Sequence, residues 1–428
     1  MGKSKKMTKK ATKKTTKKAT KKITKQSNPL SQAKSLLQKA LKSTDWHTDL
    51  DPKSARKSLE TFSTGSIVIN HLIGGKPNDR GIPPCPGVPK GRILNLYGHE
   101  SSGKTTIALQ TSVETIKAGG TVCYIDWEHE IVPDYAMELG IPIGDETKFM
   151  LCQPDTLDDG VAILWTMASA GVSLIVLDSV GAGVPKAYFN KPIAETAEQA
   201  RLGLNAAVWS QFLPKLKGRI ATTKTAVLGI SQTRAAINTT GYGETITVQG
   251  GWAWKFYSAV RMKLKKIATE KASEYSPLTN KHDNRVVGAK IRVKLDKCKV
   301  SRQQGNEEDV YIRWGYGVDD LRSLIEIGVA HRLVRKDGSW FTWVTPDGEE
   351  IRYQGMENFR GFFVERAEIR KTLERQVRPY MTVRSSDHED IMDEEEVFVG
   401  GSDLKTNDAE IQDILASIST EAPPEEPK

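Results

Sequence analysis

Short apolar runs alternate with longer amphipathic segments through the middle of the chain. Hydrophobic residues at helical spacing predict a helix at 105–117 and a longer one at about 195–216. Four apolar runs have the length and composition of buried strands: 92–97, 122–126, 174–178 and 225–230. This alternation predicts an α/β core, in which helices flank both faces of a mostly parallel sheet.

The segments on either side of this core have other patterns. Strand-like runs at 259–267 and 289–300 are spaced as the arms of a hairpin, and 319–381 mixes helical patterns with aromatic-rich turns. Apolar residues at helical spacing from Leu30 to Leu41 predict an amphipathic helix that needs a surface to cover. We expect five parts: a Lys-rich disordered tail at 1–27, a helix and linker at 28–58, the core at 59–318, a small α+β C-terminal domain at 319–384, and an acidic disordered tail at 385–428.

Charge is divided unevenly along the 428 residues. The formal net charge is +9, but the first 44 residues hold 15 lysines and no acid, whereas 385–428 hold 14 acids and two lysines. Opposed tails on a mildly basic body favour a polyanionic partner with an internal competitor for it, although both tails also suit a merely solubilising role.

The spacing of the cysteines and the lengths of the apolar runs indicate the cellular compartment of the protein. The four cysteines show no CxxC spacing, which speaks against a zinc ribbon or a disulfide framework. No run approaches the ~20 apolar residues of a membrane span, and the lysine-rich start is unlike a secretory signal. We therefore expect a cytoplasmic protein without a membrane partner.

A complete phosphate-binding motif follows the first predicted strand. It runs GHESSGKT from Gly98 to Thr105 and leads into a predicted helix, which is the context that its mechanism requires. Backbone amides of such a loop face phosphates, Lys104 neutralises β/γ oxygens, and the Thr105 hydroxyl with Asp178 at the end of a later strand would hold Mg²⁺. The expected nucleotide contacts are Gly98, Glu100, Ser101, Ser102, Gly103, Lys104, Thr105, Thr106 and Asp178.

Two polar residues lie just past strands that should end at the same edge of the sheet. Glu128 follows 122–126, and Gln232 follows 225–230. A carboxylate there can orient water for hydrolysis, and an amide can sense the γ-phosphate. Strand-end Glu and Gln are also common as ordinary solvated residues, so spacing alone leaves both interpretations open.

Seven segments, read in order, resemble the RecA family over about 60–343: GHESSGKTT, YIDWEHEIVPDYA, LCQPDT, LIVLDSVGAGVPKA, ISQTR, GGWAWKFYSAVR and VVGAKIRVKLDKCKV. The resemblance implies a RecA-type P-loop core, ATP and Mg²⁺ as cofactors, and homologous pairing and strand exchange in DNA recombination and repair. It implies that Glu128 activates water, that Gln232 couples the γ-phosphate to DNA, and that Tyr135 stacks on adenine. The family's acidic contact to adenine falls on Val132 here.

The resemblance also assigns DNA contacts and partners. The partners are single-stranded DNA, a homologous duplex and further copies in a helical filament packed through the N-terminal helix, with single-strand-binding and loader proteins as further candidates. The cytoplasm would be bacterial, or that of a host if the chain is phage-encoded. The expected DNA contacts are Arg201, Arg234, Ile237, Gly250 and Gly251 for the single strand, and Lys266, Arg292 and Lys294 for the duplex.

Lys297 and Lys299 are expected to complete the ATP site of the adjacent subunit. They alternate on a predicted strand, so their side chains should face the same way. In RecA-like proteins two lysines at this place reach the γ-phosphate across the filament interface. A basic hairpin face that serves DNA directly explains the same charges.

Other interpretations stay open for the whole chain. A hexameric RecA-fold helicase would share the phosphate site and Glu128, but not Lys297, Lys299 or the N-terminal helix. A DNA-coating filament protein without hydrolysis would not need Glu128 and Gln232. The stretch 233–251 could likewise be an active-site lid, and the hairpin lysines a solvated face.

Overall fold

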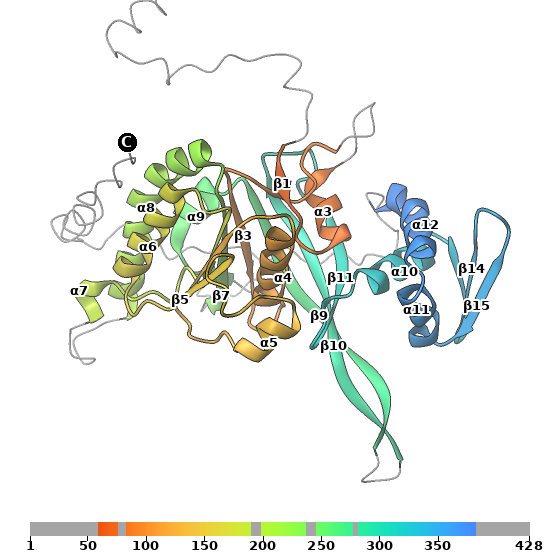
Figure 1. The fold of residues 1–428 in the computed structure, drawn as a ribbon. Coiled ribbons are helices and arrows are strands. Elements are labelled where there is room, and N and C mark those ends of the chain that lie inside the picture. The colour runs from red at the N-terminus through yellow and green to blue at the C-terminus, as the bar shows by residue number, and fades with distance from the viewer. Residues whose placement is uncertain (1–58, 76–82, 190–197, 237–244, 277–280, 382–428) are drawn as a thin grey trace, which may run out of the picture. The chain divides into compact units, whose positions relative to one another are not determined.

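The computed structural model describes residues 59–75, 83–189, 198–236, 245–276 and 281–381 (Figure 1). The two charged tails and the helix expected at 30–41 lie outside these residues. Within them, no helix is both long and apolar enough to cross a membrane.

One large sheet forms the centre of the fold. Six strands run parallel in the order β5-β4-β6-β7-β3-β9, and β10, β11 and β12 extend the sheet antiparallel beyond β9, while β8 pairs with the far part of β7. The strands are β3 Ile93–Gly98, β4 Val122–Asp126, β5 Phe149–Cys152, β6 Leu174–Asp178, β7 Ala226–Ala236, β8 Thr245–Val248, β9 Val260–Ser276, β10 Lys281–Cys298, β11 Glu307–Arg313 and β12 Gly317–Val318.

Helices cover both faces of this sheet, as the sequence pattern predicts (Figure 1). Alternate residues of one strand enter two different cores: Leu94 and Leu96 of β3 belong to one cluster, and Ile93 to the other. The first cluster includes α3 Ile67–Gly74, α4 Lys104–Lys117 and α5 Pro133–Glu138. The second includes α6 Leu157–Ala170, α8 Glu198–Thr223 and α9 Gly251–Tyr257. The expected α/β class is confirmed.

Two elements are longer than the sequence predicts. Helix α8 continues past residue 216 to Thr223 because Leu216 and Ile220 are both buried in the second cluster. The hairpin of β9 and β10 extends well beyond the sheet (Figure 1), since the pairing of β9 with β3 stops at Leu264 and that of β10 with β11 stops at Gly288.

The last described segment has a hydrophobic cluster of its own. Helix α10 Asp320–Ala330 leads into a three-stranded antiparallel sheet, followed by two further helices and a short 3-10 turn, Arg378–Tyr380. The cluster packs Phe341, Trp343, Phe359 and Phe363 together with apolar residues of all three helices. The sheet consists of β13 Val334–Asp337, β14 Trp340–Val344 and β15 Glu350–Gln354, and the helices that follow are α11 Met356–Val364 and α12 Ala367–Val377. Three short elements complete the described fold: β1 Thr61–Phe62, β2 Val88–Pro89 and α7 Lys186–Phe189.

Candidate nucleotide and DNA sites

The phosphate loop connects the buried strand β3 to the N-terminus of α4. Both glycines of its motif stand where a side chain would clash with neighbouring atoms. A Cβ on Gly98 would collide with the carbonyl oxygen of Leu264 in β9. Gly103 is the N-cap of α4 in the left-handed region, with φ at 84°, and a Cβ there would also meet the Ile312 side chain. The loop thus leads directly into the N-terminus of α4, and the first backbone N–H groups of a helix are suited to bind an anion.

Lys104 is the one Lys or Arg residue of this loop, and its ammonium group is hydrogen-bonded to the loop itself. Nζ donates hydrogen bonds to the carbonyl oxygens of Gly98 at 3.1 Å and His99 at 2.7 Å, and to Ser102 Oγ at 3.3 Å. Burial lowers the pKa of Lys104, and the nearby carboxylates oppose this shift. A phosphate in the loop would replace carbonyl dipoles with full charges, which suits a partly desolvated ammonium group.

The residues expected to hold Mg²⁺ are in direct contact. Thr105 Oγ1 donates to Asp178 Oδ2 at 2.8 Å, and the hydroxyl of buried Tyr124 donates to the same oxygen at 2.8 Å. Burial raises the pKa of Asp178 to about 6, against the effect of these two hydrogen bonds. A buried carboxylate is stabilised by a cation, and Mg²⁺ prefers oxygen ligands. The carboxylate of Asp178 and the hydroxyl of Thr105 therefore fit a magnesium ion whose other ligands are water and phosphate oxygens.

Glu128 and Gln232 meet at the same edge of the sheet. Gln232 Nε2 donates to both carboxylate oxygens of Glu128, at 2.8 Å each. Gln232 also pairs in register with Gly98, the first residue of the phosphate loop. Burial raises the pKa of Glu128, which makes its carboxylate a better base than a solvated one. The two strand-end residues are thus partners rather than separate solvated groups.

Asp126 organises this edge, although the sequence did not single it out. It accepts hydrogen bonds from the backbone N–H groups of Glu128 at 3.1 Å and Ile131 at 3.2 Å, and from Gln153 Nε2 at 3.0 Å. Asp126 therefore fixes the turn that carries Glu128 and joins it to the strand end of β5.

The remaining nucleotide contacts surround the loop. The Tyr135 hydroxyl on α5 lies 3.2 Å from Thr106 Oγ1 on α4, so the ring expected to stack on adenine is held beside the loop. Ser102 is buried, whereas Glu100 and Ser101 are exposed. Val132 is exposed as well and precedes α5.

The residues expected to bind a single strand are placed only in part. Arg201 lies on α8 and Arg234 on β7, but their side chains, and Ile237 altogether, lie outside what the structure describes. Gly250 and Gly251 start α9 with φ of 93° and 76°, and a Cβ on Gly251 would lie 2.8 Å from that of Ala206. Close packing of α9 on α8 therefore requires Gly251, and a Cβ on Gly250 would collide with Val180, whether or not DNA approaches either glycine.

The basic residues of the hairpin form a ladder across three strands. Arg292 pairs in register with Lys265 on β9 and Asp309 on β11, and Lys294 pairs with Lys263 and Glu307. Directly opposed residues share a face of the sheet. The sequence therefore missed Lys263 and Lys265, which face the same way as Arg292 and Lys294.

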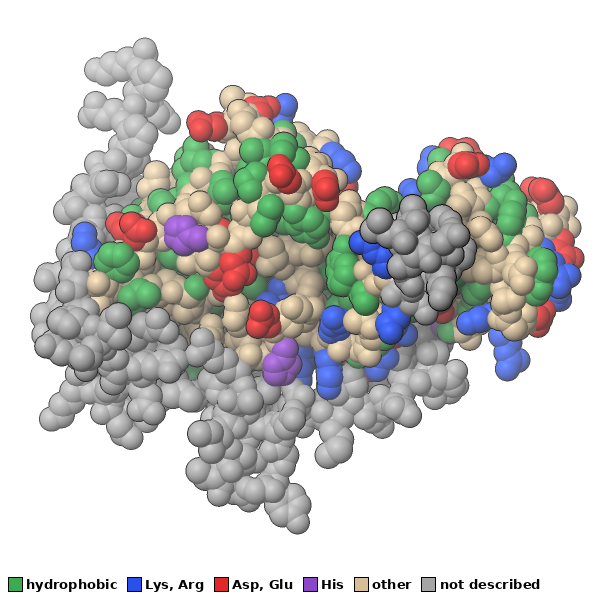
Figure 2. Space-filling model, turned by 90° about the horizontal axis from the view of Figure 1, so that it is seen from below, with side chains coloured by type: hydrophobic (Ala, Val, Ile, Leu, Met, Phe, Trp, Pro, Cys, Tyr) green, Lys and Arg blue, Asp and Glu red, His purple; other side chains and the backbone are tan. Residues whose placement is uncertain are grey.

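The same ladder is partly neutralised by acid. Arg292 donates to Asp309 twice, at 2.7 and 3.1 Å, and Lys290 Nζ lies 2.7 Å from Asp309 as well. Lys266 is exposed and lies opposite Ile291, next to an irregularity in the pairing. Viewed from the hairpin side, Lys and Arg side chains gather near the centre of the face (Figure 2).

Family models and curated relatives identify the family of this chain. Residues 44–319 match the family model of the RecA N-terminal domain, and 322–382 match that of the RecA C-terminal domain. The chain belongs to the RecA family. Protein RecA of Paenarthrobacter aurescens is 34% identical over 329 residues, which cover 77% of this chain and 85% of that one. Protein RecA of Mycolicibacterium vanbaalenii is 33% identical over 343 residues, covering 80% and 89%. A crystal structure of the RadB recombinase is similar over 61% of this chain and 99% of that one, at 19% identity and a TM-score of 0.41.

The two lysines expected to act across a RecA filament interface are placed differently from each other. Lys297 Nζ donates to the carbonyl oxygens of Lys255 and Phe256 at the C-terminal end of α9, the latter at 3.0 Å. Burial lowers the pKa of Lys297 to about 8, with further effects from Lys299 and Arg261. Lys299 is exposed and follows the last residue of β10, so only Lys297 lies on the strand.

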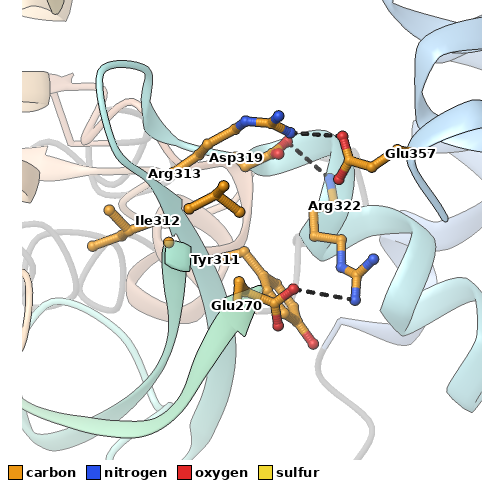
Figure 3. Close-up of a pocket in the computed structure, with 9 residues that line it drawn as sticks. Glu270, Tyr311, Ile312, Arg313, Asp319, Arg322 and Glu357 are labelled. Atoms are coloured by element: carbon orange, nitrogen blue, oxygen red, sulfur yellow. Dashed lines mark hydrogen bonds and ion pairs between the residues drawn. The ribbon is translucent and has the colours of Figure 1, made fainter. Parts of the chain in front are cut away.

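A separate pocket lies far along the chain from the phosphate loop. Glu270, Tyr311, Arg313 and Arg322 line it, and Arg322 ion-pairs with Glu270 at 3.6 Å (Figure 3). Arg313 reaches Glu357 of α11 at 2.8 Å. These two ion pairs cross the pocket and join the large sheet to the C-terminal segment.

Proposed function

We propose that this chain is an ATP-hydrolysing recombinase that assembles on single-stranded DNA and pairs it with a homologous duplex. Its family, RecA, acts in homologous recombination and repair through ATP-dependent recombinases. The single observation that carries the finer proposal is the contact of Gln232 with Glu128, because it joins the hydrolytic carboxylate to the strand that leads into the DNA loop.

Hydrolysis is assigned to residues that converge on the phosphate loop. Lys104 and the amides of α4 would bind the β- and γ-phosphates, and Thr105 with Asp178 would hold Mg²⁺, which supplies charge for the phosphoryl oxygens. Glu128 would take a proton from the attacking water, and its raised pKa keeps it basic enough for that task. Gln232 now binds both oxygens of Glu128, so it would have to release the carboxylate before water can use it.

Coupling to DNA follows from the course of the chain. Strand β7 continues from Gln232 to Ala236, and β8 returns to Gly250 at the start of α9. Lys297 is hydrogen-bonded to the other end of α9. A DNA strand bound by the stretch 233–251 would therefore act on the γ-phosphate sensor at one end and on Lys297 at the other.

We propose further that Lys297 and Lys299 complete the ATP site of the neighbouring subunit, and mixing two inactive variants tests this assignment. Lys297→Ala/Lys299→Ala keeps its own phosphate loop, and Lys104→Ala keeps its two lysines. If the lysines act on the neighbouring subunit, the mixture regains part of the DNA-dependent ATPase, because some interfaces then join an intact loop to intact lysines. Lys215→Ala, at an exposed position of α8, is the control and should keep the parental rate. A mixture that stays inactive while both variants co-assemble on DNA would refute the assignment.

A further inference from the structure

Two of the four cysteines lie side by side at the edge of the parallel sheet. Cys123 is on β4 and Cys152 ends β5, and their sulfur atoms are 3.9 Å apart. Cys152 pairs in register with Ile125, two residues after Cys123, so both side chains point to the same face of the sheet. Among the strands that the structure describes, β5 ends the row of parallel strands and pairs with β4 alone.

The two thiols differ in accessibility and acidity. Cys123 is 1% exposed, whereas Cys152 is partly exposed. The contact with Cys123 lowers the pKa of Cys152 to about 7, and the same contact together with burial raises the pKa of Cys123. Since Cys152 is the accessible thiol of the pair, it suits the role of the attacking residue, and buried Cys123 beside it suits that of the resolving residue.

We propose that Cys123 and Cys152 form a reversible disulfide when the protein meets hydrogen peroxide, and that this disulfide slows ATP hydrolysis. In the first step the Cys152 thiolate attacks one peroxide oxygen, the O–O bond breaks, and the other oxygen leaves as water after protonation, which leaves a sulfenic acid. In the second step the Cys123 sulfur attacks Cys152 Sγ, the S–O bond breaks, and hydroxide departs as water with the Cys123 proton. The peroxide is reduced by the two electrons that the thiols lose.

Closure of the bond should disturb the hydrolytic edge. A disulfide requires about 2 Å between the sulfurs, so the end of β5 has to move toward β4. The next residue, Gln153, donates to Asp126, and Asp126 holds the backbone N–H of Glu128. A shift of β5 is thereby passed to the carboxylate that we propose activates water. This second half rests on the proposed function, whereas the formation of the disulfide does not.

The other pair of cysteines provides an internal comparison. Cys85 and Cys298 are both buried, and burial raises the pKa of Cys85 to about 12. At neutral pH Cys85 is therefore a protonated, inaccessible thiol, and it should resist mild oxidation while Cys152 reacts.

The test treats the full chain at pH 7.5 with submillimolar hydrogen peroxide and then maps its cysteines. Trypsin cleaves after Lys148, so the disulfide would join peptide 118–148 to peptide 149–186. We expect to find that joined peptide, with Cys85 and Cys298 still reduced. The joined peptide should disappear when dithiothreitol is added. Cys123→Ser should stop at a sulfenic acid on Cys152 that dimedone traps, and Cys152→Ser should leave all remaining thiols reduced. A protein that keeps four thiols, or joins another pair, would overturn the site.

The regulatory half is measured on the same samples. We expect the rate of DNA-dependent ATP hydrolysis by the parent to fall about tenfold on oxidation and to recover with dithiothreitol. The rate of Cys123→Ser/Cys152→Ser should be unchanged by the same oxidation. An ATPase rate unchanged by a fully formed disulfide would overturn the inhibition. Reduced parent protein without any DNA-dependent ATPase would instead count against the proposed function, and the peptide map would still decide the site.

Discussion

Replacing Asp178 by asparagine should stabilise the nucleotide-free protein while it abolishes magnesium-dependent binding of ATP. Burial raises the pKa of Asp178 from 3.8 to about 6, so folding carries the cost of an ionised buried carboxylate at neutral pH. That difference corresponds to about 3 kcal/mol well above pH 6. Thr105 and Tyr124 donate to the same oxygen of Asp178, so an asparagine oxygen at that position still accepts both hydrogen bonds, and their weakening by the loss of charge costs about 1 kcal/mol. We therefore expect a net gain of about 1–2 kcal/mol.

The gain should depend on pH in a defined direction. A carboxyl whose pKa is raised on folding binds its proton more tightly in the folded state. Its contribution to stability is therefore best at low pH and is lost as the pH rises from 3.8 through about 6. Roughly half of the cost is present at pH 5 and all of it at pH 7.5. The advantage of the variant should shrink accordingly between these two pH values.

Thermal melting measures both effects. Without nucleotide, Asp178→Asn should melt a few degrees above the parent at pH 7.5 and closer to it at pH 5. With ATP and Mg²⁺, the parent should gain stability and the variant should not. Asp347→Asn, at an exposed position after β14, is the matched control and should leave melting and ATP binding unchanged. A variant that melts below the parent at pH 7.5, or whose advantage is the same at both pH values, would refute the argument.

Two further substitutions test the loop and the base. Glu128→Gln keeps an amide partner for Gln232 and should retain ATP binding, while hydrolysis falls by about 100-fold or more. In the parent, the pKa of Glu128 is raised, so as the pH is lowered the rate should begin to fall at a higher pH than it would with a solvated carboxylate. A parental rate in that variant would exclude the role. Gly103→Ala should weaken ATP binding, because it adds both a left-handed alanine and a clash with Ile312. Gly119→Ala has the same φ penalty of about 1 kcal/mol with no atom within 4 Å of the new Cβ, so its ATP affinity should stay parental.

The sequence predicted the part of the site that is encoded locally. The phosphate loop, the strand ending in Asp178 and the strand that precedes Glu128 all appear where apolar runs and motif spacing place them. Strand β5 and helix α6 were not predicted, although Thr156 caps α6 and two acids occupy its first turn. Gly160 interrupts that helical pattern, and the fold explains it, because the Trp127 ring fills the space of its side chain.

Contacts between distant segments could not be predicted from spacing. The role of Asp126 depends on Gln153, which is 27 residues away, and the ion pairs of Arg292 depend on the register of three strands. The hydrogen bonds of Lys297 to α9 likewise join residues 41 and 42 apart. Such pairings follow from the sheet as a whole, so only the fold reveals them.

A homologous pairing assay decides whether this protein is a recombinase. A labelled single-stranded oligonucleotide is incubated with the protein, ATP and Mg²⁺, and a supercoiled duplex of matching or unrelated sequence is then added. We predict joint molecules with the matching duplex alone, and none with Lys104→Ala. If the parent coats the single strand and hydrolyses ATP on it, yet forms no joint molecules or forms them equally with the unrelated duplex, the chain is not a recombinase of the kind proposed.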